Sequence, residues 1–261
     1  YSVLRRAKLI TLLTLITLMS SLAVIEVTPS TTDYLSDNNF WNGFSELSKL
    51  LKPKFIRGSY PSYLSPSSAL VIIPLRNYST YEASLIRDFI SRGGLLIITS
   101  ENPIYSNKLL GMLGSHVRVL NGTLLDPVIN VRNRFFPKII DFSSSKVLSN
   151  VSSLALNIAS ALSVEYPAKA IAWSSITSFL DVDGADVRDP DEVVGPLPVI
   201  AVESLGRGEL VVIADSSLWI NSMIFREGNY EFLRNLIKGR EVYVLSLIHI
   251  SEPTRPLYIS Y

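Results

Sequence analysis

Two acidic residues stand directly after apolar runs that are typical of buried strands. Glu101 follows the run 95–100, and Asp215, with Ser216 after it, follows the run 209–214. In open parallel sheets, ligands bind beyond the carboxyl ends of the strands, so both carboxylates would face one crevice. Such a pair can act as general acid and base, which is the chemistry of a hydrolase. The alternative is structural: Asp215 would accept backbone N–H groups and fix the turn that follows.

Two asparagines near this crevice are expected to have structural roles. Asn221 would tie down a loop, and Asn229 would cap the last helix. Together with Asp215 and Ser216, they form the set of residues that we expect to hold the loop after the last apolar run.

The stretch "DVDGADVRDPDE" (181–192) has six carboxylates among its twelve residues. Such a cluster repels itself unless it is solvated or neutralised, for example by a Ca²⁺ ion with about six to eight oxygen ligands. Asp181, Asp183, Asp189 and Glu192 stand at positions 1, 3, 9 and 12 of an EF-hand-like count, but position 5 is an alanine and position 6 is not glycine. The stretch predicts either a weak, loop-ordering Ca²⁺ site or a solvated acidic loop.

Composition excludes several kinds of chemistry. The chain has no Cys, which excludes thiolate nucleophiles and Cys-based metal sites. Of its two histidines, His116 has no partner motif and His249 lies near the C-terminus. Trp41, Trp173 and Trp219 could line a sugar or peptide site, although core packing is the ordinary role of Trp. No P-loop or G-x-G-x-x-G motif occurs, so Ca²⁺ is the one cofactor considered.

The charge distribution argues against nucleic acid as a partner. The net charge is +1, but residues 26–244 carry 20 basic and 22 acidic side chains. No stripe of Lys or Arg with interleaved aromatic residues occurs. The chain therefore lacks a surface that would neutralise phosphates.

Apolar runs alternate with amphipathic stretches through the chain. We expect helices at 44–51, 79–92, 104–113 and 229–239, and strands at 69–74, 95–100, 168–175, 197–204 and 208–217, with weaker strands near 117–120 and 138–142. Ser79 and Glu82 form a capping box. The runs on either side of Gly206–Gly208 predict a hairpin. The strand–helix–strand order predicts an α/β fold with a mostly parallel sheet flanked by helices.

Three stretches, 78–101, 179–221 and 227–237, combine in a more specific order: acidic loop, GP-x-PV, G-x-G strand, D-x-S-x-x-x-N and N-x-x-F-x-x-N-L. They resemble the domain of unknown function 4350 family of archaeal and bacterial membrane-associated proteins, over roughly residues 40–240. The resemblance implies a flavodoxin-like or class I glutamine amidotransferase-like fold. The enzymes among those relatives use a Cys nucleophile with a His partner, so the resemblance carries the fold and not the chemistry.

The N-terminus predicts a membrane segment, because a basic start precedes an uncharged run from Leu9 to Ile25. As a helix this run would be roughly 26 Å long, slightly short of a bilayer core of about 30 Å. We expect an uncleaved anchor over residues 1–27, with a signal peptide cleaved after Ala23 as the alternative. The basic residues keep the start of the chain in the cytoplasm and place the domain outside. Residues 28–40 are expected to form a stalk.

The stretch 245–261 has two prolines and a His and lacks the hydrophobic periodicity of the domain before it. "LSLIHISEPTR" resembles the translation of a sequencing-library adapter, and "ISY" (259–261) resumes the same adapter after an index. The interpretation is that 245–261 is non-native, so that the α/β domain covers 41–244. The native C-terminus would then be missing, and the family resemblance allows a second membrane helix there.

Together these features predict a single-pass membrane protein with an extracytoplasmic domain, or a secreted one if the N-terminal segment is cleaved. The expected role is a non-catalytic binding or scaffolding module that serves a transporter or a cell-surface complex, by analogy with the resembled family. The alternatives are a hydrolase that uses Glu101 and Asp215, and a purely structural surface protein. Carboxylates within about 10 Å in an open pocket would favour the hydrolase.

Overall fold

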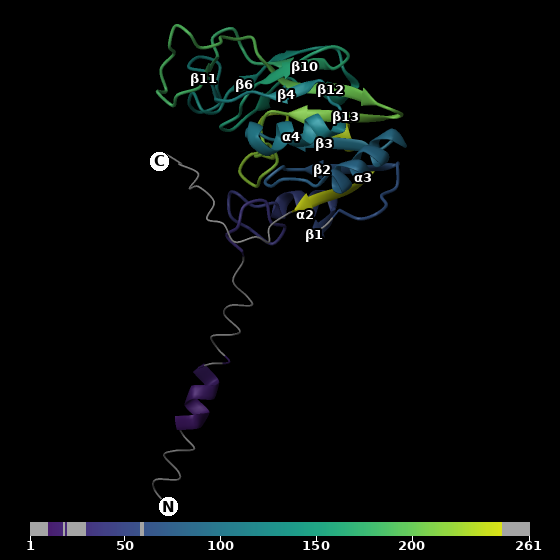
Figure 1. Ribbon diagram of the computed structural model, residues 1–261. Helices are drawn as coiled ribbons and strands as arrows, with labels where there is room; N and C mark the ends of the chain where they lie inside the picture. The colour runs from purple at the N-terminus through teal and green to yellow at the C-terminus, as the bar shows by residue number, and fades with distance from the viewer. Residues whose placement is uncertain (1–9, 18, 20–29, 58–59, 247–261) are drawn as a thin grey trace, which may run out of the picture.

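The computed structural model describes residues 10–17, 19, 30–57 and 60–246. Its centre is an eight-stranded mixed sheet (Figure 1). In order across the sheet, the strands are β1 (Lys54–Arg57), β14 (Glu241–Ser246), β2 (Ser68–Ile72), β3 (Leu95–Thr99), β13 (Gly208–Ile213), β12 (Pro198–Leu205), β10 (Lys169–Trp173) and β7 (Asp141–Phe142). The strands from β1 to β13 are parallel, and β12, β10 and β7 continue the sheet in antiparallel pairings. The predicted α/β sheet is confirmed, with a parallel half and an antiparallel extension.

Helices cover both faces of the parallel half. They are α2 (Ser45–Leu51), α3 (Thr80–Ser91), α4 (Pro103–Leu113) and α5 (Asn229–Ile237). Phe89 of α3 packs in one core cluster with Leu96 of β3, and Phe232 of α5 packs in the other cluster with Ile97. Successive side chains of a strand point to opposite faces, so β3 is buried on both sides. This explains why the parallel strands read as continuous apolar runs.

Shorter strands form three two-stranded sheets near the antiparallel half, at the top of Figure 1. The pairs are β11 (Phe179–Asp181) with β5 (Thr123–Leu125), β4 (Val117–Val119) with β9 (Leu162–Val164), and β6 (Lys138–Ile139) with β8 (Leu154–Ala155); a short 3₁₀ helix, η1, spans Lys146–Leu148. The predicted strand 138–142 is in fact two strands, β6 and β7, which belong to different sheets. The chain between β8 and β9 reaches the end of β13, where Ser160 N–H donates to the carbonyl of Ala214 at 2.8 Å.

Local signals in the sequence are confirmed where they rest on neighbouring residues. Ser79 Oγ accepts from the N–H of Glu82 at 3.1 Å, and Glu82 Oε2 accepts from the N–H of Ser79 at 3.0 Å, which completes the capping box at the start of α3. The predicted hairpin joins β12 to β13, with Leu205 opposite Gly208.

The N-terminal segment is described only in part. Residues 10–17 and 19 are helical, and within them Thr14 and Thr17 donate their hydroxyl hydrogens to the carbonyls of Ile10 and Leu13 at 2.8 and 3.0 Å. Across the described ranges, no helix combines the length and the apolar character needed to cross a membrane. The rest of the predicted anchor lies outside the described residues.

The last described strand extends past the predicted end of the domain. β14 lies between β1 and β2, and its residue Leu245 pairs with Ile56 on one side and Ile72 on the other. Leu245 is only 2% exposed. The predicted boundary at residue 244 therefore falls inside a strand, because the pairing register continues to Ser246. Residues 247–261, including His249, lie outside the described residues.

Candidate functional site

A pocket of about 640 Å³ is lined by residues that follow two parallel strands. Glu101 comes two residues after β3, and Ser216 comes three residues after β13. The other lining residues come from the segments 33–42, 131–136, 155–158 and 217–226. The pocket therefore occupies the carboxyl edge of the parallel half, where ligands bind in open α/β sheets.

The N-terminal arm, residues 30–44, forms one wall of this pocket. The hydroxyl of Tyr34 lies 2.8 Å from Ser216 Oγ in a hydrogen bond. The N–H of Ser222 donates to the carbonyl of Trp41 at 3.0 Å. From residue 30 onward, the predicted stalk is therefore folded against the domain.

Asn221 holds the arm in place. Its Nδ2 donates to the carbonyls of Asn38 and Phe40 at 3.0 and 2.6 Å, and its Oδ1 accepts from the N–H of Glu46 at 2.9 Å. The arm turns tightly at Gly43, where a Cβ atom would lie 2.0 Å from the carbonyl oxygen of Asn38. No larger residue fits at Gly43 without moving the arm, and the contacts of Asn221 are those of a residue that ties down a loop.

Glu101 and Asp215 differ in their access to the pocket. Glu101 is half-buried, lines the pocket, and accepts from the N–H of Ser216 at 2.9 Å. Asp215 is fully buried and is not among the lining residues. Its Oδ2 accepts from Asn157 N–H at 2.8 Å, and its Oδ1 accepts from both the N–H and the hydroxyl of Ser217 at 2.7 Å. Asp215 thus fixes the loop beneath the pocket.

Negative charge gathers at the floor of the pocket. Burial raises the pKa of Asp215 to about 7 although hydrogen bonds from Ser217 and Asn157 lower it, and the charge of Glu101 adds to the rise. The pKa of Tyr34 is also raised, first by burial and then by the charges of Glu101, Asp33 and Asp215. The negative charges of these three carboxylates therefore help to keep the hydroxyl of Tyr34 protonated.

Asn229 has a different role from the predicted helix cap. Gly228 is the residue before α5, and no side chain caps that end. The side chain of Asn229 is fully buried and accepts from Ala155 N–H at 3.0 Å. Its Nδ2 donates to the carbonyls of Ala155 and Met223 at 2.9 and 3.0 Å. Asn229 thus joins two segments that line the pocket.

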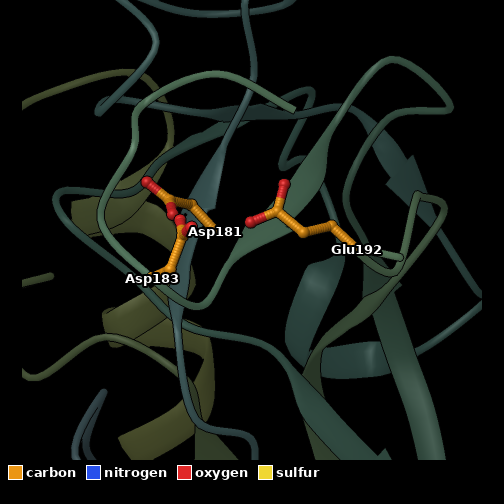
Figure 2. A group of neighbouring side chains, drawn as sticks. All are labelled: Asp181, Asp183 and Glu192. Atoms are coloured by element: carbon orange, nitrogen blue, oxygen red, sulfur yellow. The ribbon is translucent and has the colours of Figure 1, made fainter. Parts of the chain in front are cut away.

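The acidic loop, residues 181–192, brings three of the four predicted Ca²⁺ ligands together. One carboxylate oxygen from each of Asp181, Asp183 and Glu192 lies within 4.8 Å of the others (Figure 2). Asp189 is not in this group, and its N–H instead donates to Glu192 Oε2 at 3.0 Å. The EF-hand-like spacing thus places positions 1, 3 and 12 together but not position 9.

Backbone groups of the loop already use these carboxylates. Asp181 accepts from the N–H groups of Gly184 and Asp186 at 2.8 and 3.0 Å. The other Glu192 oxygen accepts from the N–H of Val182 at 3.1 Å. Hydrogen bonding within the loop accounts for the convergence without an ion, so Ca²⁺ binding stays a prediction.

A family model for a domain of unknown function (DUF4350) matches residues 36–237. The chain belongs to this family. The match covers both the arm from residue 36 and the loops that follow β3 and β13. It stops before β14, so the last strand of the DUF4350 chain lies beyond the matched region.

No curated protein matches this DUF4350 chain. Among solved structures, it is similar to the mmIFT52 N-terminal domain, with a TM-score of 0.48 and 16% identity over 63% of this chain and 73% of that one. It is also similar to a β-galactosidase from Bacillus circulans sp. alkalophilus, with a TM-score of 0.42 and 13% identity over 65% of this chain and 22% of the enzyme. The cytoplasmic protein STM1381 from Salmonella typhimurium LT2 gives a TM-score of 0.42 and 13% identity over 65% and 70% of the two chains. Likenesses of this size carry no functional information.

Several pocket residues of the DUF4350 chain carry no sequence signal of their own. Asp33 and Asn42 stand in a polar stretch that resembles a linker, and Asn157 and Arg132 stand in the irregular middle of the chain. Trp41 was a candidate for a binding role and lines the pocket at 40% exposure. The sheet brings these segments together, so only the topology could have revealed them.

Proposed function

We propose that this chain is a non-catalytic binding module that holds a small ligand in the pocket at the carboxyl edge of its sheet. The observation that carries the proposal is the pocket itself. About 640 Å³ is within the range of ligand sites, roughly 300–1,000 Å³. Its lining combines aromatic surface, such as Trp41 and Phe136, with a few polar groups such as Glu101 and Asn157. This mixture is typical of small-molecule sites.

The second part of the proposal concerns location. We propose that the chain before residue 28 anchors the module in the membrane, with the domain on the extracytoplasmic side, where it serves a transporter or a surface complex. The sequence supports this through its basic start and its uncharged run. The hydroxyl bonds of Thr14 and Thr17 to their own helix add support, because they remove the cost of placing those groups in lipid. The arm then connects the anchor directly to a wall of the pocket.

The pocket is tested by a thermal-shift screen of small polar ligands against the full chain and Trp41→Ala. A ligand of the pocket raises the melting temperature of the unmutated chain and loses most of that effect in the variant. Tyr166→Ala is the matched control, because Tyr166 is 90% exposed and does not line the pocket. If every stabilising ligand acts equally on both variants, the pocket is not the binding site.

The anchor is tested separately by an alkaline carbonate wash of membranes. Retention in the membrane fraction supports the anchor, whereas a soluble species that begins at Val24 supports cleavage. Loss of the intact chain to the wash would contradict the anchor.

A hydrolase is the second candidate, since a carboxyl group with a pKa of about 7 suits a general acid. The binding module is favoured because Asp215 is buried beneath the pocket and already bonded to Asn157 and Ser217. We expect no hydrolysis of nitrophenyl esters or glycosides above the buffer rate. Turnover that is lost in Glu101→Gln would replace the binding proposal with the enzyme.

Two finer proposals concern the fold and the tail. We propose that the fold is of the flavodoxin-like or amidotransferase-like kind, which the parallel half with helices on both faces supports. We also propose that the tail, residues 245–261, derives from a sequencing adapter. Amplification of the genomic region across the junction of codons 244 and 245 tests it, because a native tail would be encoded there without interruption.

A further inference from the structure

The floor of the pocket is acidic and has no cation to balance it. Asp33 and Glu101 line the pocket, and Asp215 lies beneath them. Within the described part of the chain, no Lys, Arg or His forms an ion pair with any of the three. Oε2 of Glu101 accepts from Ser216 N–H, and no described donor contacts its Oε1. Oδ1 of Asp33 already accepts from Asn42 Nδ2. A ligand that covers Glu101 must donate a hydrogen bond or bring positive charge, because desolvating a carboxylate that has no ion pair is costly.

The rest of the lining carries the opposite charge. Arg132 and Arg226 both line the pocket and both are exposed, whereas Asp33 and Glu101 are half-buried. Neither guanidinium forms an ion pair in the described residues; Arg226 Nε donates only to the carbonyl of Ser222, at 3.3 Å. The lining thus combines half-buried carboxylates with exposed guanidinium groups.

Apolar side chains also line the pocket. Trp41 and Phe136 line the pocket together with Ile220 and Met223. The exposed ring of Trp41 offers a face for an apolar group or for a cation. An occupant that uses the whole pocket needs an apolar body.

We propose that the pocket binds a short zwitterionic peptide, with its free α-ammonium group at the Asp33–Glu101 floor and its carboxylate toward Arg132 and Arg226. Side chains of the peptide pack on Trp41. This inference rests on the proposed binding function and specifies the ligand. A neutral saccharide could donate hydroxyl groups to the floor but leaves both guanidinium groups unused. A nucleotide could place its phosphate at the guanidinium groups but brings no positive charge to the carboxylates. A volume of about 640 Å³ has room for a tripeptide.

The experiment is isothermal titration of the full chain with the tripeptide Ala-Phe-Ala, its N-acetylated form and its C-terminal amide. Acetylation removes the ammonium charge and is expected to weaken binding at least tenfold, because the floor carboxylates then lose their partner. Amidation is expected to weaken binding severalfold, and this loss should vanish in the double variant Arg132→Gln, Arg226→Gln. In Glu101→Gln, the loss caused by acetylation should become severalfold smaller, because Asp33 is then the one carboxylate left among the lining residues.

The variants have matched controls. Glu101→Gln keeps an oxygen that can accept from Ser216 N–H, so the loop beneath the pocket should stay folded. Glu165→Gln and Arg207→Gln remove the same charges from exposed positions outside the pocket and should leave all three affinities unchanged. Melting curves establish that each variant is folded.

The outcomes separate this inference from the proposed function. Equal binding of the free and acetylated peptides, or no binding of Ala-Phe-Ala at millimolar concentration, overturns the peptide inference. If neutral saccharides then stabilise the protein in a Trp41-dependent way, the pocket still binds ligands but not peptides. If no small ligand depends on Trp41, both proposals fall.

Discussion

The pocket and the acidic loop both bring carboxylates together, but by different means. In the loop, Asp181, Asp183 and Glu192 are close in sequence, and their oxygens hold the backbone of the same loop. In the pocket, Asp33 and Glu101 come from segments far apart, and one oxygen of Glu101 has no donor among the described residues. The acidic run thus brings its carboxylates together through local hydrogen bonds, whereas the pocket carboxylates are brought together by the fold.

The largest expected effect is the pH dependence of stability that Asp215 causes. Its folded-state pKa is raised to about 7, above an ordinary value of about 4. The folded state therefore binds this proton more tightly, so the contribution of Asp215 to stability is full below about pH 4 and is lost as the pH rises toward 7. A difference of three pKa units corresponds to about 4 kcal/mol. Urea melts between pH 4.5 and 7.5 measure this slope.

Asp215→Asn is the comparison for that experiment. It cannot ionise, and its remaining oxygen can accept from Asn157 or Ser217. As the pH rises, the free energy of unfolding of the unmutated chain should therefore fall relative to that of the variant. Parallel curves across this range would mean that Asp215 ionises normally and is fully charged at neutral pH, despite its burial.

The next effect is that of Asn221→Ala, which releases the arm from the pocket. The variant loses the bonds to Asn38, Phe40 and Glu46, and we expect a loss of about 2 kcal/mol in the free energy of unfolding. Limited proteolysis should cut the arm faster in this variant. Asn235→Ala is the control, since Asn235 makes one exposed bond to Ser149, and it should cost no more than about 0.5 kcal/mol. Equal losses would mean that the arm is held by other contacts.

A smaller effect is expected in the acidic loop. Asp181→Ala leaves the N–H groups of Gly184 and Asp186 without their acceptor. The expected cost is about 1 kcal/mol, because Asp181 is buried but both donor residues are exposed and water can reach their N–H groups. Asp191→Ala, at an exposed position, should cost nothing measurable. Urea melts compare the two. Neither variant should change binding in the pocket, and a change in either would show that the two regions are coupled.

The smallest effect is that of Ca²⁺. At a concentration equal to its Kd, an ion that binds only the folded form adds about 0.4 kcal/mol, or about 1 °C in the melting temperature of a domain of this size. We expect a shift of this order between millimolar Ca²⁺ and chelator. The double variant Asp181→Asn, Asp183→Asn should abolish it. An equal shift in the double variant, or none in the unmutated chain, would end the Ca²⁺ prediction.

Local features of the fold could be predicted from the sequence because their causes are local. The capping box of Ser79 and Glu82 and the hairpin near Gly206 each depend on residues a few positions apart. The runs 69–74 and 95–100 were predictable as strands because burial on both faces removes polar residues. The family resemblance also held, since the match covers residues 36–237.

Features that depend on long-range pairing could not be predicted. β5 and β11 have three residues each and pair across more than fifty positions, so neither shows a periodic pattern. Asp33 and Tyr34 belong to the pocket because long-range contacts, among them those of Asn221, hold the arm there. Glu101 was predictable as a crevice residue from its position after a strand, whereas the burial of Asp215 depends on the loop that contains Asn157.

The position of β14 has a consequence for how the protein must be produced. This strand comes late in the described chain, yet it lies in the sheet between β1 and β2, and it is the strand through which β1 joins the sheet. Until residue 246 has been synthesised, β1 has no neighbour in the sheet and the edge of β2 is open, so the parallel half of the sheet cannot close before that point. A truncated chain cut at the family boundary, residue 237, would lack this strand and expose a long apolar edge that favours aggregation. A version of the domain made for expression should therefore include residues 30–246.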